Sequence, residues 1–121
     1  MRDIVVWADI PVSDMKRASA FYASVTGEPV VVMPGTNDTV AVIGAPDSRV
    51  SADLYVGGTP SHEGPTVYFG SGDDIDGMVA RVVEAGGKIL EEKQFMGESI
   101  GWIVFFEDSE GNRVGIQQPG A

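Results

Sequence analysis

The sequence predicts an α+β domain made of two copies of one unit, in which a strand and a helix are followed by three strands. The order of strand-like and helix-like segments is the same in both halves of the 121-residue chain. The helix-punctuating residues also recur at one spacing, since Asp74 and Gly87 lie 60 residues after Asp14 and Gly27. The 16 glycines and 7 prolines indicate many turns, as this fold requires.

The first unit opens with a strand-like run at 4–10 that is rich in β-branched and aromatic residues. Alternation divides its side chains into two rows. One row is entirely apolar and is expected to face the helices. The other row contains Trp7 and ends in Asp9, so it is expected to face a region that tolerates a carboxylate.

A helix is predicted next, with Ser13 or Asp14 as its N-cap and Gly27 as its end. Apolar side chains between these residues recur at helical spacing. Turn-forming clusters then separate three strand-like runs at about 28–33, 39–43 and 50–56.

The most linker-like stretch lies at about 58–64, and the pattern restarts after it. A strand at 66–69 precedes a helix that Asp73 or Asp74 caps and Gly86-Gly87 ends. Three further strands are predicted at 88–92, 101–107 and 113–118. We therefore expect a single domain over 1–121, with module 1 at about 1–57, the linker, and module 2 at about 65–121.

Composition excludes several classes of function. The chain has no cysteine, so it has no disulfide framework, thiolate metal site or cysteine nucleophile. Its one histidine, His62, excludes a three-histidine metal site within the chain and lies in the linker, where we expect it to be exposed. The formal net charge of −10 argues against nucleic-acid and membrane partners. No signal peptide or spanning segment is apparent, and we expect a cytoplasmic protein.

Three segments carry a family resemblance: residues 10–22, with Phe21-Tyr22 at its end; residues 72–88; and residues 106–115, with Asp108-Ser109-Glu110-Gly111-Asn112 at its centre. In this order they resemble the vicinal oxygen chelate superfamily of glyoxalases, bleomycin-resistance proteins and dioxygenases, and its small glyoxalase-like subgroup in particular. The resemblance implies two βαβββ modules whose curled mixed sheet surrounds a cleft, with the helices outside. It also implies a homodimer.

The family's enzymes usually bind a divalent metal through four cleft-facing positions. By the resemblance, these positions fall on Trp7, on Asp53 or Tyr55, on Val67 and on Gly115. Because tryptophan, valine and glycine side chains cannot ligate a divalent ion, we predict no metal site and no cofactor. Asp9 and Asp53 leave only a weak possibility of a divalent Mg²⁺ or Ca²⁺.

We therefore predict a small-molecule binding protein of the glyoxalase/bleomycin-resistance type, with an aromatic or cationic ligand. The alternative is a lyase or isomerase that uses Asp9 and Asp53 as catalytic acid and base, or a reduced metal site. Trp7 either stacks on the ligand or fills the space of the metal, and Asp9 either serves the ligand or pairs with Arg113. The candidate ligand-binding residues are Trp7, Tyr55, Val67, Phe69, Trp102, Arg113, Gly115 and Gln117.

Overall fold

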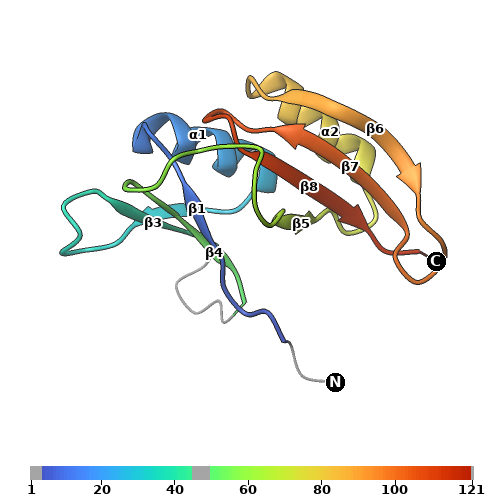
Figure 1. Cartoon of the computed structure of the whole chain (residues 1–121), viewed down its shortest axis with the longest axis horizontal. Coiled ribbons are helices and arrows are strands. Elements are labelled where there is room, and N and C mark those ends of the chain that lie inside the picture. The colour runs from blue at the N-terminus through green and yellow to red at the C-terminus, as the bar shows by residue number, and fades with distance from the viewer. Residues whose placement is uncertain (1–3, 45–49, 121) are drawn as a thin grey trace.

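The computed structural model describes residues 4–44 and 50–120, and in these ranges it contains two helices and eight strands (Figure 1). The elements of module 1 are β1 (Asp9–Pro11), α1 (Met15–Thr26), β2 (Val30–Val32), β3 (Val40–Ile43) and β4 (Ala52–Tyr55). Those of module 2 are β5 (Tyr68–Gly70), α2 (Ile75–Glu84), β6 (Lys88–Phe95), β7 (Trp102–Glu107) and β8 (Arg113–Gln118). The predicted α+β class and the repeated βαβββ order are confirmed.

Each module forms its own four-stranded mixed sheet, in the order β1-β4-β3-β2 and β5-β8-β7-β6. The first and last strands of each module pair in parallel, and the remaining pairs are antiparallel. Within the described part of the chain no strand pairing joins the two sheets, so the curled surface is divided into two sheets that do not close. β1 and β5 are edge strands of their respective sheets.

The structure shows which of the predicted residues caps each helix: Asp14 is the N-cap of α1 and Asp74 is the N-cap of α2. The side chain of Asp14 accepts a hydrogen bond from the Arg17 amide at 3.0 Å, and Asp74 accepts one from the Gly77 amide at 2.9 Å. The amide at the third helical position has no partner inside the helix, which is why an aspartate before it stabilises the first turn. Gly27 ends α1 with a φ of 71°, a left-handed conformation that suits glycine.

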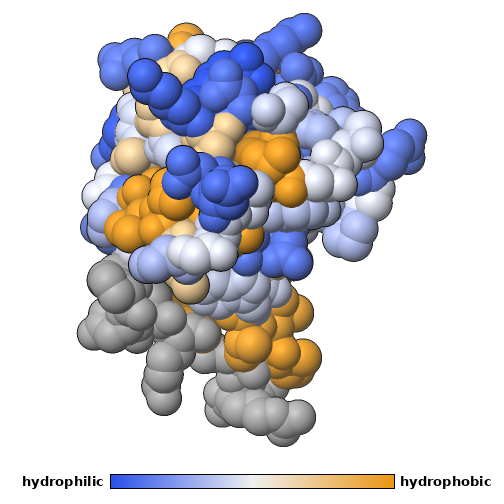
Figure 2. All heavy atoms as spheres, turned by 90° about the vertical axis from the view of Figure 1, so that its left-hand side faces the viewer, coloured by the Kyte–Doolittle hydropathy of each residue, from blue (hydrophilic) through white to orange (hydrophobic). Residues whose placement is uncertain are grey.

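The first strand is shorter than predicted, because β1 begins at Asp9 and the run was expected from residue 4. The Val6 and Ala8 carbonyls still accept hydrogen bonds from Ser51 and Asp53, so the segment continues to follow β4. The side chains of Ile4, Val5, Val6 and Trp7 are nevertheless exposed. Hydrophobic surface gathers at the lower end of the molecule in Figure 2, beside the grey residues.

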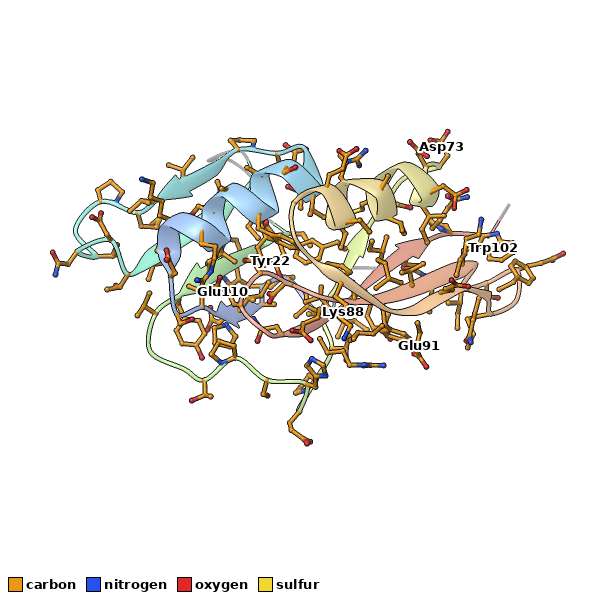
Figure 3. The ribbon with its side chains drawn as sticks, turned by 90° about the horizontal axis from the view of Figure 1, so that it is seen from above. Tyr22, Asp73, Lys88, Glu91, Trp102 and Glu110 are labelled. Atoms are coloured by element: carbon orange, nitrogen blue, oxygen red, sulfur yellow. The ribbon has the colours of Figure 1, made fainter. Side chains whose placement is uncertain are left out.

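In Figure 3 the two helices lie next to each other, and the linker runs along the side of the molecule away from them. α1 contacts β2, β3 and β4, α2 contacts β6, β7 and β8, and the two helices contact each other. Each sheet therefore has one covered face and one open face. Neither helix is long and apolar enough to cross a membrane.

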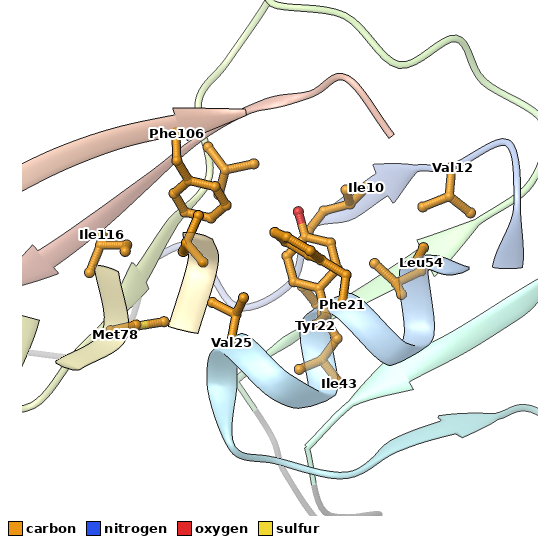
Figure 4. Packing of buried hydrophobic residues seen from close by; sticks show 14 of the residues in the cluster. Ile10, Val12, Phe21, Tyr22, Val25, Ile43, Leu54, Met78, Phe106 and Ile116 are labelled. Carbon is orange, nitrogen blue, oxygen red and sulfur yellow. The ribbon is translucent and has the colours of Figure 1, made fainter. Parts of the chain in front are cut away.

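One hydrophobic core joins the modules, and its two largest fully buried side chains are Tyr22 of α1 and Phe106 of β7 (Figure 4). The ring of Tyr22 lies 5.5 Å from that of Phe69, and the ring of Phe21 lies 6.2 Å from that of Phe106. Because Phe69 and Phe106 belong to module 2, these aromatic contacts bury apolar surface of both modules at once. The Phe21-Tyr22 pair thus packs the helix of module 1 against module 2.

The turn between β7 and β8 makes a polar contact between the modules. The Tyr22 hydroxyl donates to Asp108 Oδ2 at 2.5 Å in the core. Asp108 Oδ1 accepts from the Glu110 and Asn112 amides, both at 2.9 Å. Asn112 donates in turn to the Pro11 carbonyl at 2.8 Å. Burial, followed by the neighbouring Asp108 carboxylate, raises the pKa of Tyr22 well above 10.0, so its hydroxyl remains a donor.

Glu110 in the same turn binds the N-terminus of α1. Its carboxylate accepts hydrogen bonds from the Ser13 and Asp14 amides at 2.9 Å and from Arg17 Nε at 2.7 Å. Burial alone would raise the pKa of Glu110, but these donors outweigh it and lower the pKa from 4.5 to about 2. A negative charge at a helix N-terminus is favourable, so module 2 stabilises the first turn of α1.

We expect Glu110→Gln to lower the free energy of unfolding by about 1–3 kcal/mol at neutral pH, because it removes a charged acceptor of several hydrogen bonds. The contribution of the ionised carboxylate is present above pH 4.5 and is lost as the pH falls toward 2. Urea denaturation across this range should show the wild-type stability falling toward that of the variant. Glu92→Gln, at an exposed position in β6, serves as the control. An equal loss in both variants would contradict the assignment.

Candidate functional site

Two neighbouring cavities lie between the modules, where the edge strands β1 and β5 are not paired with each other. The larger has a volume of about 1050 Å³ and is lined by segments 5–8 and 65–70, together with residues 43–44 and 50–52 and parts of both helices. The smaller has a volume of about 350 Å³ and lies between residues 8–11, the linker and the start of β8. Ala8, Pro65 and Val67 line both cavities, so the two spaces adjoin.

The structure brings Trp7, Asp9 and Asp53 together on the open face of sheet 1. Asp9 lies opposite Asp53 in the parallel register of β1 and β4, so both side chains lie on the same face. The indole Nε1 of Trp7 donates to Asp53 Oδ2 at 2.7 Å. Trp7 keeps 40% of its surface exposed and lines the larger cavity, whereas Asp9 lines the smaller one.

Asp53 is the most unusual carboxyl group of this site. Only 8% of its surface is exposed to solvent, and its Oδ1 is buried without a hydrogen-bond partner. Burial raises the pKa of Asp53; the Trp7 hydrogen bond opposes this shift, and the nearby Asp9 carboxylate adds to it. Burial next to a second carboxyl group therefore favours the uncharged form of Asp53.

Arg113 lies across the smaller cavity from Asp9 but is bound elsewhere. Its Nη1 donates to Thr66 Oγ1 at 2.7 Å, and its guanidinium lies 3.9 Å from the centre of the Phe105 ring. A weak ion pair with Glu91 at 3.9 Å completes its surroundings. Among the ion pairs of residues 4–44 and 50–120 none links Asp9 to Arg113. The alternative in which Arg113 neutralises Asp9 is therefore not what the structure shows.

Gly115 lies beneath the ring of Tyr68. The two residues are opposite each other in the parallel pairing of β5 and β8, and a Cβ on Gly115 would approach Tyr68 Cδ2 to 2.4 Å. Tyr68 also packs edge-on against Phe105, at 5.7 Å between ring centres. The space beside Gly115 is therefore filled by an aromatic ring that is still 45% exposed.

Two other candidate residues lie on the open faces but face different surroundings. Tyr55 lies opposite Pro11, and its hydroxyl lies against Gly58 at the start of the linker. Gln117 donates to the Ile100 carbonyl at 2.9 Å, which holds the loop between β6 and β7. Neither lines the two cavities described above.

Three candidate residues lie toward the helix-covered side. Val67 and Phe69 pack against the core and reach the cavities from that side, with Val67 lining both and Phe69 the larger. Trp102 also packs against the core, next to Phe95 and beneath Lys93. Its pairing with Gln118 sets it on the opposite face of sheet 2 from Gly115, and it lines neither of the two cavities.

The sequence interpretation missed Tyr68 and the linker residues Thr59, Ser61 and Glu63. Alternate linker residues line the smaller cavity, a spacing that matches an extended chain. The Ser61 amide donates to Asn112 Oδ1 at 3.2 Å, and the Ser61 carbonyl accepts from the Arg113 amide at 3.3 Å. His62 is exposed, as expected, with Nε2 3.1 Å from Glu107 Oε2. The alternation of oxygen-bearing side chains at 59, 61 and 63 is the sequence signal from which these linker residues could have been predicted.

The residues present do not form a metal site of the type that the resemblance implies. Trp7 donates its only polar hydrogen to Asp53, Val67 is apolar, and Tyr68 covers Gly115. Over the described ranges no group of three or more His, Cys, Asp or Glu side chains is suitably placed to hold a metal ion. Asp9 and Asp53 are two carboxyl groups, fewer than a dedicated divalent site needs.

Comparisons with known proteins identify relatives of this fold. A sequence model described as the Glyoxalase/Bleomycin resistance protein/Dioxygenase superfamily matches residues 4–116. A search of curated protein sequences finds no match. Among solved structures, a glyoxalase/bleomycin resistance protein from Albidiferax ferrireducens has a TM-score of 0.75 at 19% identity, over 96% of this chain and 98% of its own.

Two further solved structures belong to proteins described by a ligand or an activity. An antibiotic binding protein from a Streptomyces species has a TM-score of 0.67 at 21% identity, over 98% of this chain and 97% of its own. A fosfomycin resistance protein from Listeria monocytogenes, in complex with Mn(II), has a TM-score of 0.72 at 12% identity, over 100% of this chain and 93% of its own. At these identities the likeness establishes the fold.

We expect Asp53→Asn to change how stability depends on pH. Because the pKa of Asp53 is raised in the fold, its contribution is complete below 3.8 and is lost as the pH rises through the raised value. The variant keeps an acceptor for Trp7 and has no charge to bury, so it should lack this loss. Thermal unfolding measured from acidic to neutral pH checks it, with Asp73→Asn at an exposed position as control. A parallel pH profile of Asp53→Asn and wild type would contradict the prediction.

We expect Gly115→Ala to destabilise the fold by about 1–3 kcal/mol, because its Cβ would displace the ring of Tyr68. Gly70→Ala is the matched control, since Gly70 is also a strand residue and a Cβ there meets nothing within 4 Å. Chemical denaturation of both variants measures the difference. Equal stability of the two variants would show that Tyr68 does not fill the space beside Gly115.

Proposed function

Because this chain belongs to the glyoxalase/bleomycin resistance protein/dioxygenase superfamily, we propose that it is a small-molecule binding protein that lacks the usual set of metal ligands. The observation that supports this proposal is the pair of adjoining cavities between the modules. The larger, at about 1050 Å³, is of the order of size that drug-sized ligands occupy, typically ~300–1,000 Å³. Such a site binds by shape and by a few polar groups.

The walls of the larger cavity suit an aromatic or otherwise apolar ligand. Trp7, Tyr68 and Phe69 contribute aromatic surface, and valines and a methionine contribute aliphatic surface. The hydrogen bond to Asp53 fixes the orientation of the Trp7 indole. A ring that is already oriented loses little conformational entropy when a planar ligand stacks on it, which favours the stacking role over the filling role.

The relatives support small molecules as the class of ligand. One neighbour of the same fold is described as an antibiotic binding protein and another as a fosfomycin resistance protein. For this chain, the cavity and the family membership together support the same class of ligand. A homodimer and a cytoplasmic location remain predictions from the sequence.

A second candidate function is a lyase or isomerase in which Asp9 and Asp53 act as acid and base. The observation that favours it is the buried Oδ1 of Asp53 beside the exposed Asp9. Burial, and to a smaller extent the Asp9 carboxyl group, raise the pKa of Asp53. A carboxyl group with a raised pKa keeps its proton more readily than a free one and can therefore serve as a general acid. Turnover of a bound compound that Asp9→Asn abolishes would favour the enzyme. A stoichiometric divalent metal in the purified protein would contradict the metal-independent site.

We expect a thermal-shift screen of aromatic compounds, both neutral and cationic, to give ligands that raise the melting temperature. Trp7→Ala should weaken their binding about tenfold, because it removes the stacking surface. Trp102→Phe is the control, because Trp102 lines neither cavity. With Trp102→Phe as background, ligand-induced fluorescence changes report on Trp7 alone. A screen without stabilising compounds, or ligands that bind Trp7→Ala equally well, would contradict the proposal.

A further inference from the structure

The strand edges that border the larger cavity carry backbone groups that no pairing uses. In the parallel pairing of β1 with β4, the Ala8 carbonyl accepts a hydrogen bond from the Asp53 amide at 2.9 Å, and the Val12 amide donates one to β4 at 2.9 Å. Along a parallel strand, every second residue directs its amide and carbonyl to the paired strand. The backbone groups of Trp7 therefore point away from β4.

β5 repeats this arrangement at the edge of the other sheet. The Val67 carbonyl accepts a hydrogen bond from an amide of β8 at 2.9 Å, and the Ser71 amide donates one to β8 at 3.0 Å. The backbone groups of Tyr68 and Gly70 therefore point away from β8. Among the residues that the structure describes, no backbone hydrogen bond uses the amide or carbonyl of Trp7, Tyr68 or Gly70.

The two edges border the same space. Trp7, Tyr68 and Gly70 all line the larger cavity, and β1 and β5 lie apart from each other in Figure 1. One hydrogen bond shows which way the β1 edge is turned. The Pro11 carbonyl, which also points away from β4, accepts from the Asn112 side chain of module 2 at 2.8 Å. The outer edge of β1 is therefore turned toward module 2.

Two such edges fit one kind of occupant. A chain that adds to a sheet edge gains its affinity from main-chain hydrogen bonds. Because successive residues of an extended chain direct their backbone groups to opposite sides, one chain can bond to both edges at once. A strand of a second folded copy does not suit this place, because every strand of the two described sheets is already paired on at least one side. The occupant has to be a short chain without a sheet of its own.

We propose that the larger cavity binds a short peptide-like ligand in an extended conformation, which pairs with β1 on one side and with β5 on the other. This inference rests on the proposed function and specifies its ligand as a molecule with several consecutive amide groups. Its side chains on one face lie beside Trp7 and Tyr68. Those on the other face lie toward Ile43 and Met78, which belong to the core. Because both walls are apolar, the ligand's side chains are aromatic or aliphatic.

The test uses three blocked tripeptides, N-acetyl-valyl-X-valine amides in which X is phenylalanine, tyrosine or tryptophan. Two ester analogues of the peptide that binds most tightly each replace one N–H by an oxygen, either at the central or at the last residue, and keep nearly the same shape. Because neighbouring N–H groups point to opposite edges, each analogue loses a hydrogen bond to a different edge. Calorimetry should show that both bind about tenfold more weakly than the parent peptide.

A variant separates pairing with the backbone from stacking on a side chain. Trp7→Ala removes the indole but keeps the amide and carbonyl of residue 7 at the edge. The parent peptide and both ester analogues should therefore bind more weakly to this variant by the same factor, so that the tenfold ratio between them remains.

Hydrogen exchange locates the bound peptide. The amides of Trp7, Tyr68 and Gly70 should exchange fast in the free protein and slowly in the complex with the parent peptide. The open edge of β2 is the matched control. The Met33 amide donates to β3, so the amide of the preceding residue, Val32, points away from β3. That amide should exchange fast with and without the peptide.

Equal affinity of the parent peptide and the ester analogues would overturn the two-edge site, and so would a loss confined to one analogue or equal protection of Val32. Slow exchange of the Trp7 and Tyr68 amides in the free protein would also overturn it, because another copy of the chain would then already cover the edges. If no tripeptide bound but the aromatic screen gave ligands, only this inference would be wrong. If neither gave a ligand, the proposed function would fail as well.

Discussion

The turn between β7 and β8 is the contact on which the arrangement of the modules depends. Asp108 holds the turn together and accepts a hydrogen bond from Tyr22, while Glu110 binds the first amides of α1. Both contacts reach from module 2 to the helix of module 1. Because both use charged acceptors, and the Asp108 carboxylate is also buried, these hydrogen bonds are strong and depend on direction. Apolar packing between Phe21 and Phe106 alone would specify their relative orientation less narrowly.

This contact also explains why a cleft exists. The modules are joined through their helices and the β7–β8 turn, and no strand pairing joins sheet 1 to sheet 2 in the described ranges. The edge strands β1 and β5 consequently stand apart, and the cavities occupy the space between them. The linker leaves β4, passes over the smaller cavity and is fastened at Ser61. The site is thus formed largely by the edge strands and the linker, while the hydrophobic core stabilises these segments.

Local signals in the sequence predicted the fold well. Asp14, Asp74 and Gly27 act at the ends of helices, where a single residue type decides the outcome. Alternation also placed Trp7 and Asp9 on one face, and Asp53 proved to be their neighbour. The register between distant strands could not be read in this way. It decides that Tyr68 covers Gly115 and that Trp102 faces the helices, and a shift of one residue exchanges the faces of a strand.

The packing of Tyr68 on Gly115 has a consequence for how the cleft can change during evolution. A carboxylate at position 115 would first meet the tyrosine ring, so Gly115→Glu is expected to be harmful while Tyr68 remains. Replacing Tyr68 by a smaller residue would remove that obstacle but would expose apolar surface of Phe105. The two substitutions are therefore epistatic, and their order matters. A lineage with this pair is held away from a carboxylate at position 115 by steric coupling, even when selection would favour one.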